Sequence, residues 1–120
     1  MSTNRIRLLV GLEIHEGKFS EFEAIAKQMV AVSEKEPGTL AYNFVLSGDR
    51  KHCRLLEGYS DAAALTAHFH GPAVQQFVPQ LLKVANLTLM EFYGDPGPEA
   101  TAMAKPFNPA IFTEFEGFDR

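Results

Sequence analysis

The chain has 120 residues, a formal net charge of -4 at pH 7 and 46% hydrophobic residues. A chain of this length forms one domain that buries roughly two-thirds of its unfolded surface. The acidic balance argues against a nucleic acid or an anionic membrane as partner, since both require a clustered basic face. The single cysteine, Cys53, excludes an intramolecular disulfide and favours a reducing compartment, so we expect a cytoplasmic protein.

The first part of the chain predicts a strand, a helix and a second strand. Residues 5 to 14 alternate in hydrophobicity, which is typical of a strand, and the apolar run is too short for a membrane span. Residues 18 to 34 repeat apolar side chains at helical spacing, and Pro37-Gly38 ends that helix. Residues 40 to 46 alternate again and lead through a turn into a hairpin.

The stretch from residue 52 to residue 72 predicts a strand followed by a short helix. One face of the strand is apolar apart from a carboxyl group, and consists of Cys53, Leu55, Glu57 and Tyr59. Ser60 is a good N-cap for the helix, whose side toward the sheet carries Leu65 and His68. If that side faces the sheet, Glu57, Tyr59 and His68 converge on one partly apolar space.

The remaining elements complete an α+β fold. Gly71-Pro72 breaks the chain, residues 74 to 81 form a helix that Pro79 must kink or shorten, and residues 86 to 93 form a last strand. This order predicts a split βαβ arrangement, with a four-stranded antiparallel sheet and helices on one face.

The second face of the sheet is predicted to be apolar as well. Its residues are Leu9, Val45, Leu56 and either Leu87 with Leu89 or Met90 with Phe92. Because the helices cover only one face, the other needs a partner. We therefore predict a homodimer whose two sheets pack face to face.

The segment from residue 94 to residue 120 differs from the preceding domain, residues 1 to 93. It contains four prolines and four phenylalanines. The prolines oppose most regular structure, while the aromatic content is too high for a typical disordered tail. We expect an extension that packs on the domain or on its dimer partner, and a lid over a pocket mouth is the sharper hypothesis.

Over about residues 5 to 93 the chain resembles the antibiotic biosynthesis monooxygenase (ABM) domain family, nearest to its quinol monooxygenase branch. The matching positions are Glu36-Pro37-Gly38, Tyr42, Glu57, Tyr59, Asp61, Leu65 and Ala67-His68. The resemblance implies a ferredoxin-like fold that assembles as a dimeric α/β barrel. Many relatives carry tryptophan where Tyr59 stands and a second histidine where Ala73 stands.

The resemblance also implies a cofactor-independent monooxygenase that acts with O2 on a small quinol or polycyclic phenolic substrate, with no metal. His68 is then the base, Glu57 orients it or holds a proton, and Tyr59 hydrogen-bonds a substrate oxygen. The predicted substrate-binding walls are Phe22, Tyr42, Phe44, Leu65 and Phe77.

Simpler interpretations of the same residues stay open. Glu57 and His68 can bond to each other only to fix the helix on the sheet, as buried polar groups need partners in any case. The alternative function is then a non-catalytic small-molecule-binding or stress-associated dimeric barrel. His68 and His70 point about 200° apart on a helix and cannot easily share a metal ion. Cys53 is interpreted as a small core residue.

Overall fold

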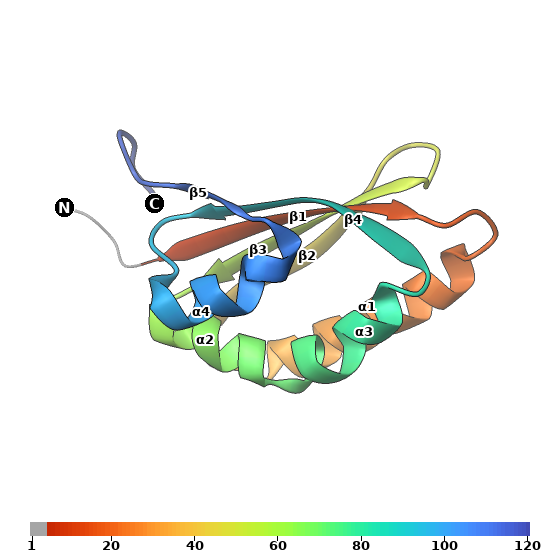
Figure 1. Cartoon of the computed structure of the whole chain (residues 1–120), viewed down its shortest axis with the longest axis horizontal. Helices are drawn as coiled ribbons and strands as arrows, with labels where there is room; N and C mark the ends of the chain where they lie inside the picture. Colours follow the sequence, from red (N-terminus) through yellow and green to blue (C-terminus); the bar gives the residue numbers. More distant parts are fainter. Residues whose placement is uncertain (1–4) are drawn as a thin grey trace.

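The computed structural model describes residues 5–120 and shows one sheet with the helices on one of its faces (Figure 1). The elements are β1 (Ile6–Ile14), α1 (Phe19–Glu34), β2 (Thr39–Leu46), β3 (His52–Tyr59), α2 (Ala62–His70), the π-helical turn η1 (Ala73–Phe77), α3 (Val78–Leu81), β4 (Ala85–Tyr93), α4 (Gly97–Ala104), the 3-10 turn η2 (Lys105–Phe107) and β5 (Ala110–Phe112). Within the described part no helix is long and apolar enough to cross a membrane. The start of the predicted domain at residue 1 lies outside the described residues.

The sheet has the strand order β2-β3-β1-β4-β5. The four predicted strands pair antiparallel, as expected for a split βαβ arrangement. The predicted count of four is wrong by one strand, because Ala110–Phe112 adds as β5, parallel to β4. The preceding Pro109 is compatible with this, since an edge strand needs ladder hydrogen bonds on one side only.

The core lies between the helices and the inner face of the sheet. Alternate residues of β1 are buried there, namely Ile6, Leu8, Val10, Leu12 and Ile14. Helix α1 buries Phe22, Ala26 and Met29, which follow one another at helical spacing. On β3 the predicted inner face is confirmed, since Cys53, Leu55, Glu57 and Tyr59 are all buried.

Helix α2 is capped by Asp61, not by the predicted Ser60. The Asp61 carboxylate accepts a hydrogen bond of 2.8 Å from the backbone N–H of Ala64. Asp61 is extended and directly precedes the first helical residue, which is where an N-cap side chain reaches a free N–H group. The helix therefore begins one residue later than the Ser60 cap implies.

The helical stretch after Pro72 is interrupted as predicted. The turn η1 closes with a hydrogen bond from Val78 N–H to the carbonyl of Ala73, and α3 then starts with Pro79 in its first turn. Proline is tolerated there because a first-turn residue needs no intrahelical donor. The π-helical turn thus accommodates a proline that would break a continuous α-helix.

A bulge in β4 decides which of its side chains face outward. The register shifts so that Gly11 pairs with Leu89 while the next residue, Leu12, pairs with Leu87. Leu87 therefore faces inward and Leu89 outward, so neither predicted pair makes up the outer set: Met90 and Phe92 are buried inside. A Cβ at Gly11 would lie 3.0 Å from the Leu89 Cβ, so the bulge fits closely around a glycine.

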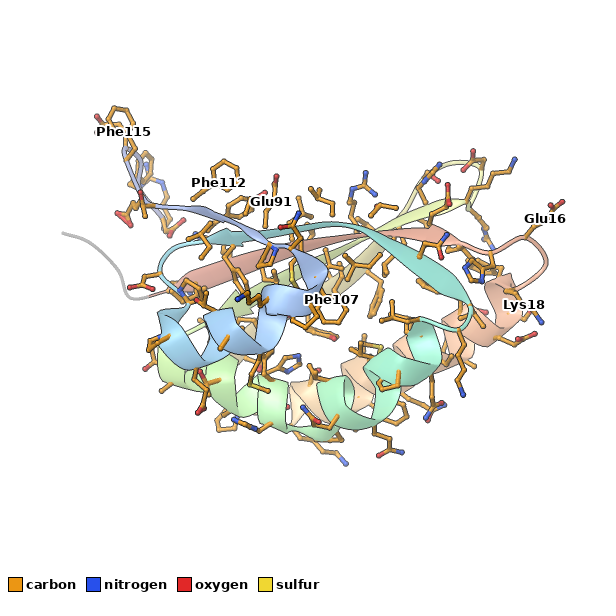
Figure 2. The ribbon with its side chains drawn as sticks, viewed as in Figure 1. Glu16, Lys18, Glu91, Phe107, Phe112 and Phe115 are labelled. Atoms are coloured by element: carbon orange, nitrogen blue, oxygen red, sulfur yellow. The ribbon has the colours of Figure 1, made fainter. Side chains whose placement is uncertain are left out.

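The segment after β4 is more regular than its prolines predict. Pro98 stands in the first turn of α4 and Pro106 in the first turn of η2, where both are tolerated. Helix α4 lies beside α2 (Figure 1). Figure 2 shows Phe107 pointing into the space between sheet and helices, whereas Phe115 projects away from the body and is 95% exposed. The division of the chain at residue 93 stays a prediction.

Candidate active site

A cavity of about 460 Å³ lies between the sheet and the helical layer. Its floor comes from inward-facing side chains of β1, β2, β3 and β4, and its roof comes from α2, η1 and α3. Its polar lining side chains are Tyr42, Glu57, His68 and Gln75. The remaining lining is apolar, which is the composition of a small-molecule site.

Four ionisable side chains form a chain with one gap, and its two central members, His68 and Glu57, line this cavity. The His68 Nδ1 atom lies 2.7 Å from Oε1 of Glu36, and its Nε2 atom lies 3.9 Å from Oε1 of Glu57. The Tyr59 hydroxyl donates a hydrogen bond to that same Glu57 oxygen. The predicted convergence of Glu57, Tyr59 and His68 is therefore present, with Glu36 as an additional member.

Glu36 determines which nitrogen of His68 is free. A carboxylate only accepts hydrogen bonds, so Nδ1 carries the ring proton and donates it to Glu36. The Thr39 hydroxyl donates a second hydrogen bond to the same Glu36 oxygen, with its Oγ1 2.7 Å from Oε1. The His68 Nε2 lone pair consequently faces Glu57 and the cavity, which is the tautomer a general base requires.

Burial keeps His68 neutral. The side chain of His68 is 1% exposed, and this burial lowers the pKa of its imidazole, while the Glu36 hydrogen bond partly offsets the lowering. An imidazole with a lowered pKa is unprotonated at pH 7, so its Nε2 atom is available to accept a proton.

Glu57, in contrast to His68, holds its titratable proton. Its burial raises the pKa of the carboxyl group to about 8, although the Tyr59 hydrogen bond acts to lower it. Near pH 7 Glu57 is therefore mostly a neutral carboxylic acid. Burial, followed by the nearby Glu57, also raises the pKa of the Tyr42 and Tyr59 phenols, so both remain neutral hydrogen-bond donors.

The gap between His68 and Glu57 suits a substrate oxygen. The 3.9 Å between Nε2 and Oε1 is too long for a direct hydrogen bond. It is shorter than twice a hydrogen-bond length of about 2.8 Å, so one oxygen atom can lie within bonding distance of both groups. The arrangement thus pairs a neutral base with a neutral acid across one binding position.

The predicted substrate-binding residues divide into three groups. Tyr42 lines the cavity, with its ring centroid 5.2 Å from that of His68. Phe22 and Phe44 stack edge to face and line a second groove between α1 and β2. Leu65 and Phe77 are buried in the core and do not line the cavity.

Sequence reasoning missed several residues that line or support the site. Glu36 precedes the Pro37-Gly38 helix stop, and from the sequence it was identified only among the positions of the family resemblance. The sequence feature that could have indicated Glu36 as a site residue is its position as a carboxylate in a turn that leads into a strand. Met103 and Phe107 reach the cavity from the C-terminal segment, and no periodicity indicates that contact.

The other reactive side chains lie outside this site. Burial raises the pKa of the Cys53 thiol to about 11, which makes it a core residue rather than a nucleophile. His70 points away from His68 and lies 3.1 Å from Glu99 on α4. Among residues 5–120 no group of three or more His, Cys, Asp or Glu side chains is arranged to hold a metal ion.

Comparison with solved structures supports the fold over nearly the whole chain. MupZ from Pseudomonas fluorescens is 25% identical with a TM-score of 0.81, and the match covers 98% of this chain and 96% of MupZ. A conserved protein of Bacteroides thetaiotaomicron described as a possible oxidoreductase is 27% identical, with a TM-score of 0.69 over 76% of this chain and 97% of its own. No curated protein sequence matches the chain significantly.

SnoaB from Streptomyces nogalater, a cofactor-independent oxygenase, shares the fold at 13% identity. Its TM-score is 0.69, and the match covers 80% of this chain and 97% of SnoaB. The family model described as antibiotic biosynthesis monooxygenase matches residues 5–80, which include β1 through α2 and therefore every member of the Glu36–His68–Glu57–Tyr59 chain. By fold and by sequence, this chain belongs to the antibiotic biosynthesis monooxygenase family.

Proposed function

We propose that the protein is a cofactor-independent monooxygenase that oxidises a quinol or phenolic substrate with His68 as the general base. The observation that carries this proposal is the orientation of His68, whose Nδ1 is held by Glu36 and whose Nε2 faces a cavity of about 460 Å³. Membership of the monooxygenase family supports the reaction class. The family match does not specify a substrate, so the quinol is itself part of the proposal.

The chemistry begins with proton transfer. A substrate hydroxyl gives its proton to Nε2 of His68, and the oxyanion that forms accepts hydrogen bonds from the neutral Glu57 acid and the Tyr42 phenol. The electron-rich anion then reduces O2 directly. A quinol provides all four electrons that O2 accepts, so one oxygen atom ends in a hydroxyquinone and the other in water.

The apolar lining supports the same reaction. Leu8, Val10, Leu55 and Met90 surround the cavity with hydrocarbon, which excludes water from the reacting anion. A dry site also strengthens the hydrogen bonds that Glu57 and Tyr42 offer to the oxyanion. These residues belong to the inner face of the sheet, so the fold itself provides the desolvated environment.

We also propose a homodimer formed through the outer face of the sheet. Val45 and Leu56 on that face are 46% and 43% exposed, and Leu9 lies beside Leu56 in the strand pairing. Packing two such faces would remove these apolar side chains from water. The active site opens on the opposite side of the sheet, so dimerisation would leave it accessible.

The alternative is a barrel that binds a small molecule without transforming it. The 2.7 Å contact between His68 and Glu36 favours this reading, because it satisfies the histidine and ties α2 to the turn before β2 without any chemistry. Under this alternative a ligand enters the cavity but no oxygen is consumed. The two functions are therefore separable by measuring oxygen and binding in parallel.

The test is oxygen uptake by metal-free and flavin-free protein with a panel of hydroquinones and polycyclic phenols. We expect uptake above the autoxidation rate, and a loss of about 100-fold to 10,000-fold in His68→Ala, the range typical of a lost general base. His70→Ala is the matched control, since this histidine lies two residues away and faces Glu99 at the surface. Full activity in His68→Ala would remove the histidine from the mechanism, and ligand binding without uptake would favour the alternative.

A further inference from the structure

The C-terminal segment forms a wall of the cavity that the family match does not include. The family model ends at residue 80, whereas Met103, Ala104 and Phe107 line the cavity from α4 and η2. Ala104 is buried, and Met103 and Phe107 are partly exposed. A side chain that both lines a cavity and meets solvent lies at its rim, so Met103 and Phe107 border the opening.

The opposite side of the opening is mostly apolar, with Gln75 as its polar member. Val74 of η1, Val78 of α3 and Leu82, which directly follows α3, line the cavity and are also partly exposed. The rim thus consists of hydrocarbon and the polar Gln75 on the helix side, and of a methionine and a phenylalanine on the C-terminal side. Figure 2 shows Phe107 pointing inward beneath the sheet.

The ionisable lining residues lie at one end of the cavity, and apolar residues line the other end. Tyr42 and Glu57 are cross-strand partners on β2 and β3, and His68 lies against them. Leu87 and Met90 belong to β4, on the other side of β1, and the C-terminal segment continues from that strand. A ligand whose hydroxyl reaches His68 must therefore extend its apolar part toward β4 and Phe107.

The volume of the cavity limits the size of that apolar part. An apolar cavity of about 150 Å³ is large enough for a benzene molecule. The cavity here is about 460 Å³, so a single hydroxylated ring would leave most of it empty. Empty apolar space forfeits contacts, and this favours a ligand with a larger hydrocarbon body.

We propose that residues 97–107 are the specificity element of this site, and that Phe107 and Met103 select amphiphilic substrates with one hydroxylated head and a hydrocarbon body larger than one ring. The placing of the head at His68 rests on the proposed function. The match with MupZ covers 98% of this chain and so includes the segment, whereas the matches with the Bacteroides protein and SnoaB cover 76% and 80%. Substrate selection by this segment therefore distinguishes the chain from relatives that share only the barrel.

The experiment measures binding of phenol and of 4-ethyl, 4-butyl and 4-hexylphenol to the full chain by calorimetry in oxygen-free buffer. Each methylene that enters the apolar end should tighten binding about fourfold. In Phe107→Ala we expect binding of 4-hexylphenol to weaken at least about tenfold and that of phenol to change less than twofold, since only the longer ligand reaches Phe107. Phe115→Ala, which removes a phenylalanine that is 95% exposed, is the matched control and should leave the series unchanged.

Three results would overturn the inference: no saturable binding of any alkylphenol, equal affinity across the series, or the same series in Phe107→Ala as in Phe115→Ala. Met103→Ala is a second variant with the same expected pattern if Phe107→Ala fails to fold in a thermal melt. Because oxygen is absent, the binding series does not depend on turnover. A length-dependent series together with no oxygen uptake would contradict the proposed function while supporting the specificity element.

Discussion

Two tyrosine–glutamate pairs on this sheet have the same local geometry and opposite environments. Tyr59 donates to Glu57 on β3, and Tyr93 donates to Glu91 on β4 at 2.6 Å, each across a spacing of two residues. The first pair is buried under α2. The second lies on the outer face, where Figure 2 shows Glu91 pointing away from the helices.

The difference between the pairs shows that burial, rather than the hydrogen bond, gives the inner pair its chemistry. The tyrosine hydrogen bond acts to lower the pKa of Glu57, yet that pKa is raised to about 8 because desolvation is the larger effect. The same side-chain pair at the surface is an ordinary polar contact. The inner face thus converts a common strand motif into a neutral acid beside a base.

The largest predicted effect is on dimer association, when a carboxylate is placed on the outer face of the sheet. Leu56→Asp puts a charge beside Glu57 on β3 but on the opposite side of the sheet, within the proposed dimer interface. Two such substitutions in a symmetric dimer should weaken association by about 3 kcal/mol or more, or at least about a hundredfold. Sedimentation across a concentration series measures this.

The control for that substitution is Leu46→Asp. Leu46 is as exposed as Leu56, at 43%, but it pairs with Cys53 at the end of the hairpin and so lies on the inner side of the strand. It should leave association unchanged. A Leu56→Asp protein that remains a dimer at the wild-type dissociation constant would refute the outer face as the interface.

A second prediction concerns Glu57→Gln and the pH dependence of stability. The folded pKa of Glu57 is about 8 and its ordinary value is 4.5, so the folded state retains a proton that the unfolded state loses. Glu57 therefore decreases the stability of the wild-type protein as pH rises from 4.5 to 8. The glutamine variant should gain about 2 to 4 kcal/mol over wild type between pH 4 and pH 8 in urea titrations.

The contribution of His68 to stability changes with pH in the opposite direction to that of Glu57. The comparison of wild type with Glu57→Gln separates the two contributions. The lowered folded pKa of His68 means that stability is lost as pH falls below the ordinary value of 6.5. This contribution is common to wild type and Glu57→Gln, so the difference between the two proteins isolates Glu57. Glu91→Gln is the surface control and should follow the wild-type pH profile, and a parallel profile for Glu57→Gln would show that Glu57 is ionised in the fold.

The smallest predicted effect is on the unfolding free energy, when each of the two tyrosine hydroxyls is removed in turn. Tyr59→Phe leaves the buried Glu57 without its donor and should cost about 1 to 3 kcal/mol of unfolding free energy. Tyr93→Phe removes a donor at the surface and should change stability by less than about 0.5 kcal/mol. Chemical denaturation at pH 6 measures both, and equal effects would mean that burial does not distinguish the pairs.

Local patterns predicted the geometry of the inner site well. Strict alternation placed Glu57 and Tyr59 on one face, and helical spacing placed His68 above them, since both periodicities are fixed by backbone geometry. The same reasoning placed Leu56 on the opposite face. These positions lie within regular elements, where the repeat of two residues in a strand or about 3.6 residues in a helix fixes which face a side chain is on.

The parts that sequence reasoning missed lie where no repeat applies. Glu36 reaches His68 from a turn, so its direction depends on tertiary packing. The bulge in β4 separates Leu87 from Leu89, which an unbroken alternation would keep together. Pro98 and Pro106 suggested irregular chain, although both stand at first-turn positions that tolerate proline.

The short strand β5 has a consequence for how copies of the sheet can join. It pairs along one side of β4 and leaves β2 as the long free edge of the sheet. Open-ended stacking of copies needs two complementary edges, and a strand of three residues is a poor template for a second. Pairing of β2 with β2 would be self-complementary and would end after two copies, so the short β5 at the other edge disfavours open-ended stacking of sheets.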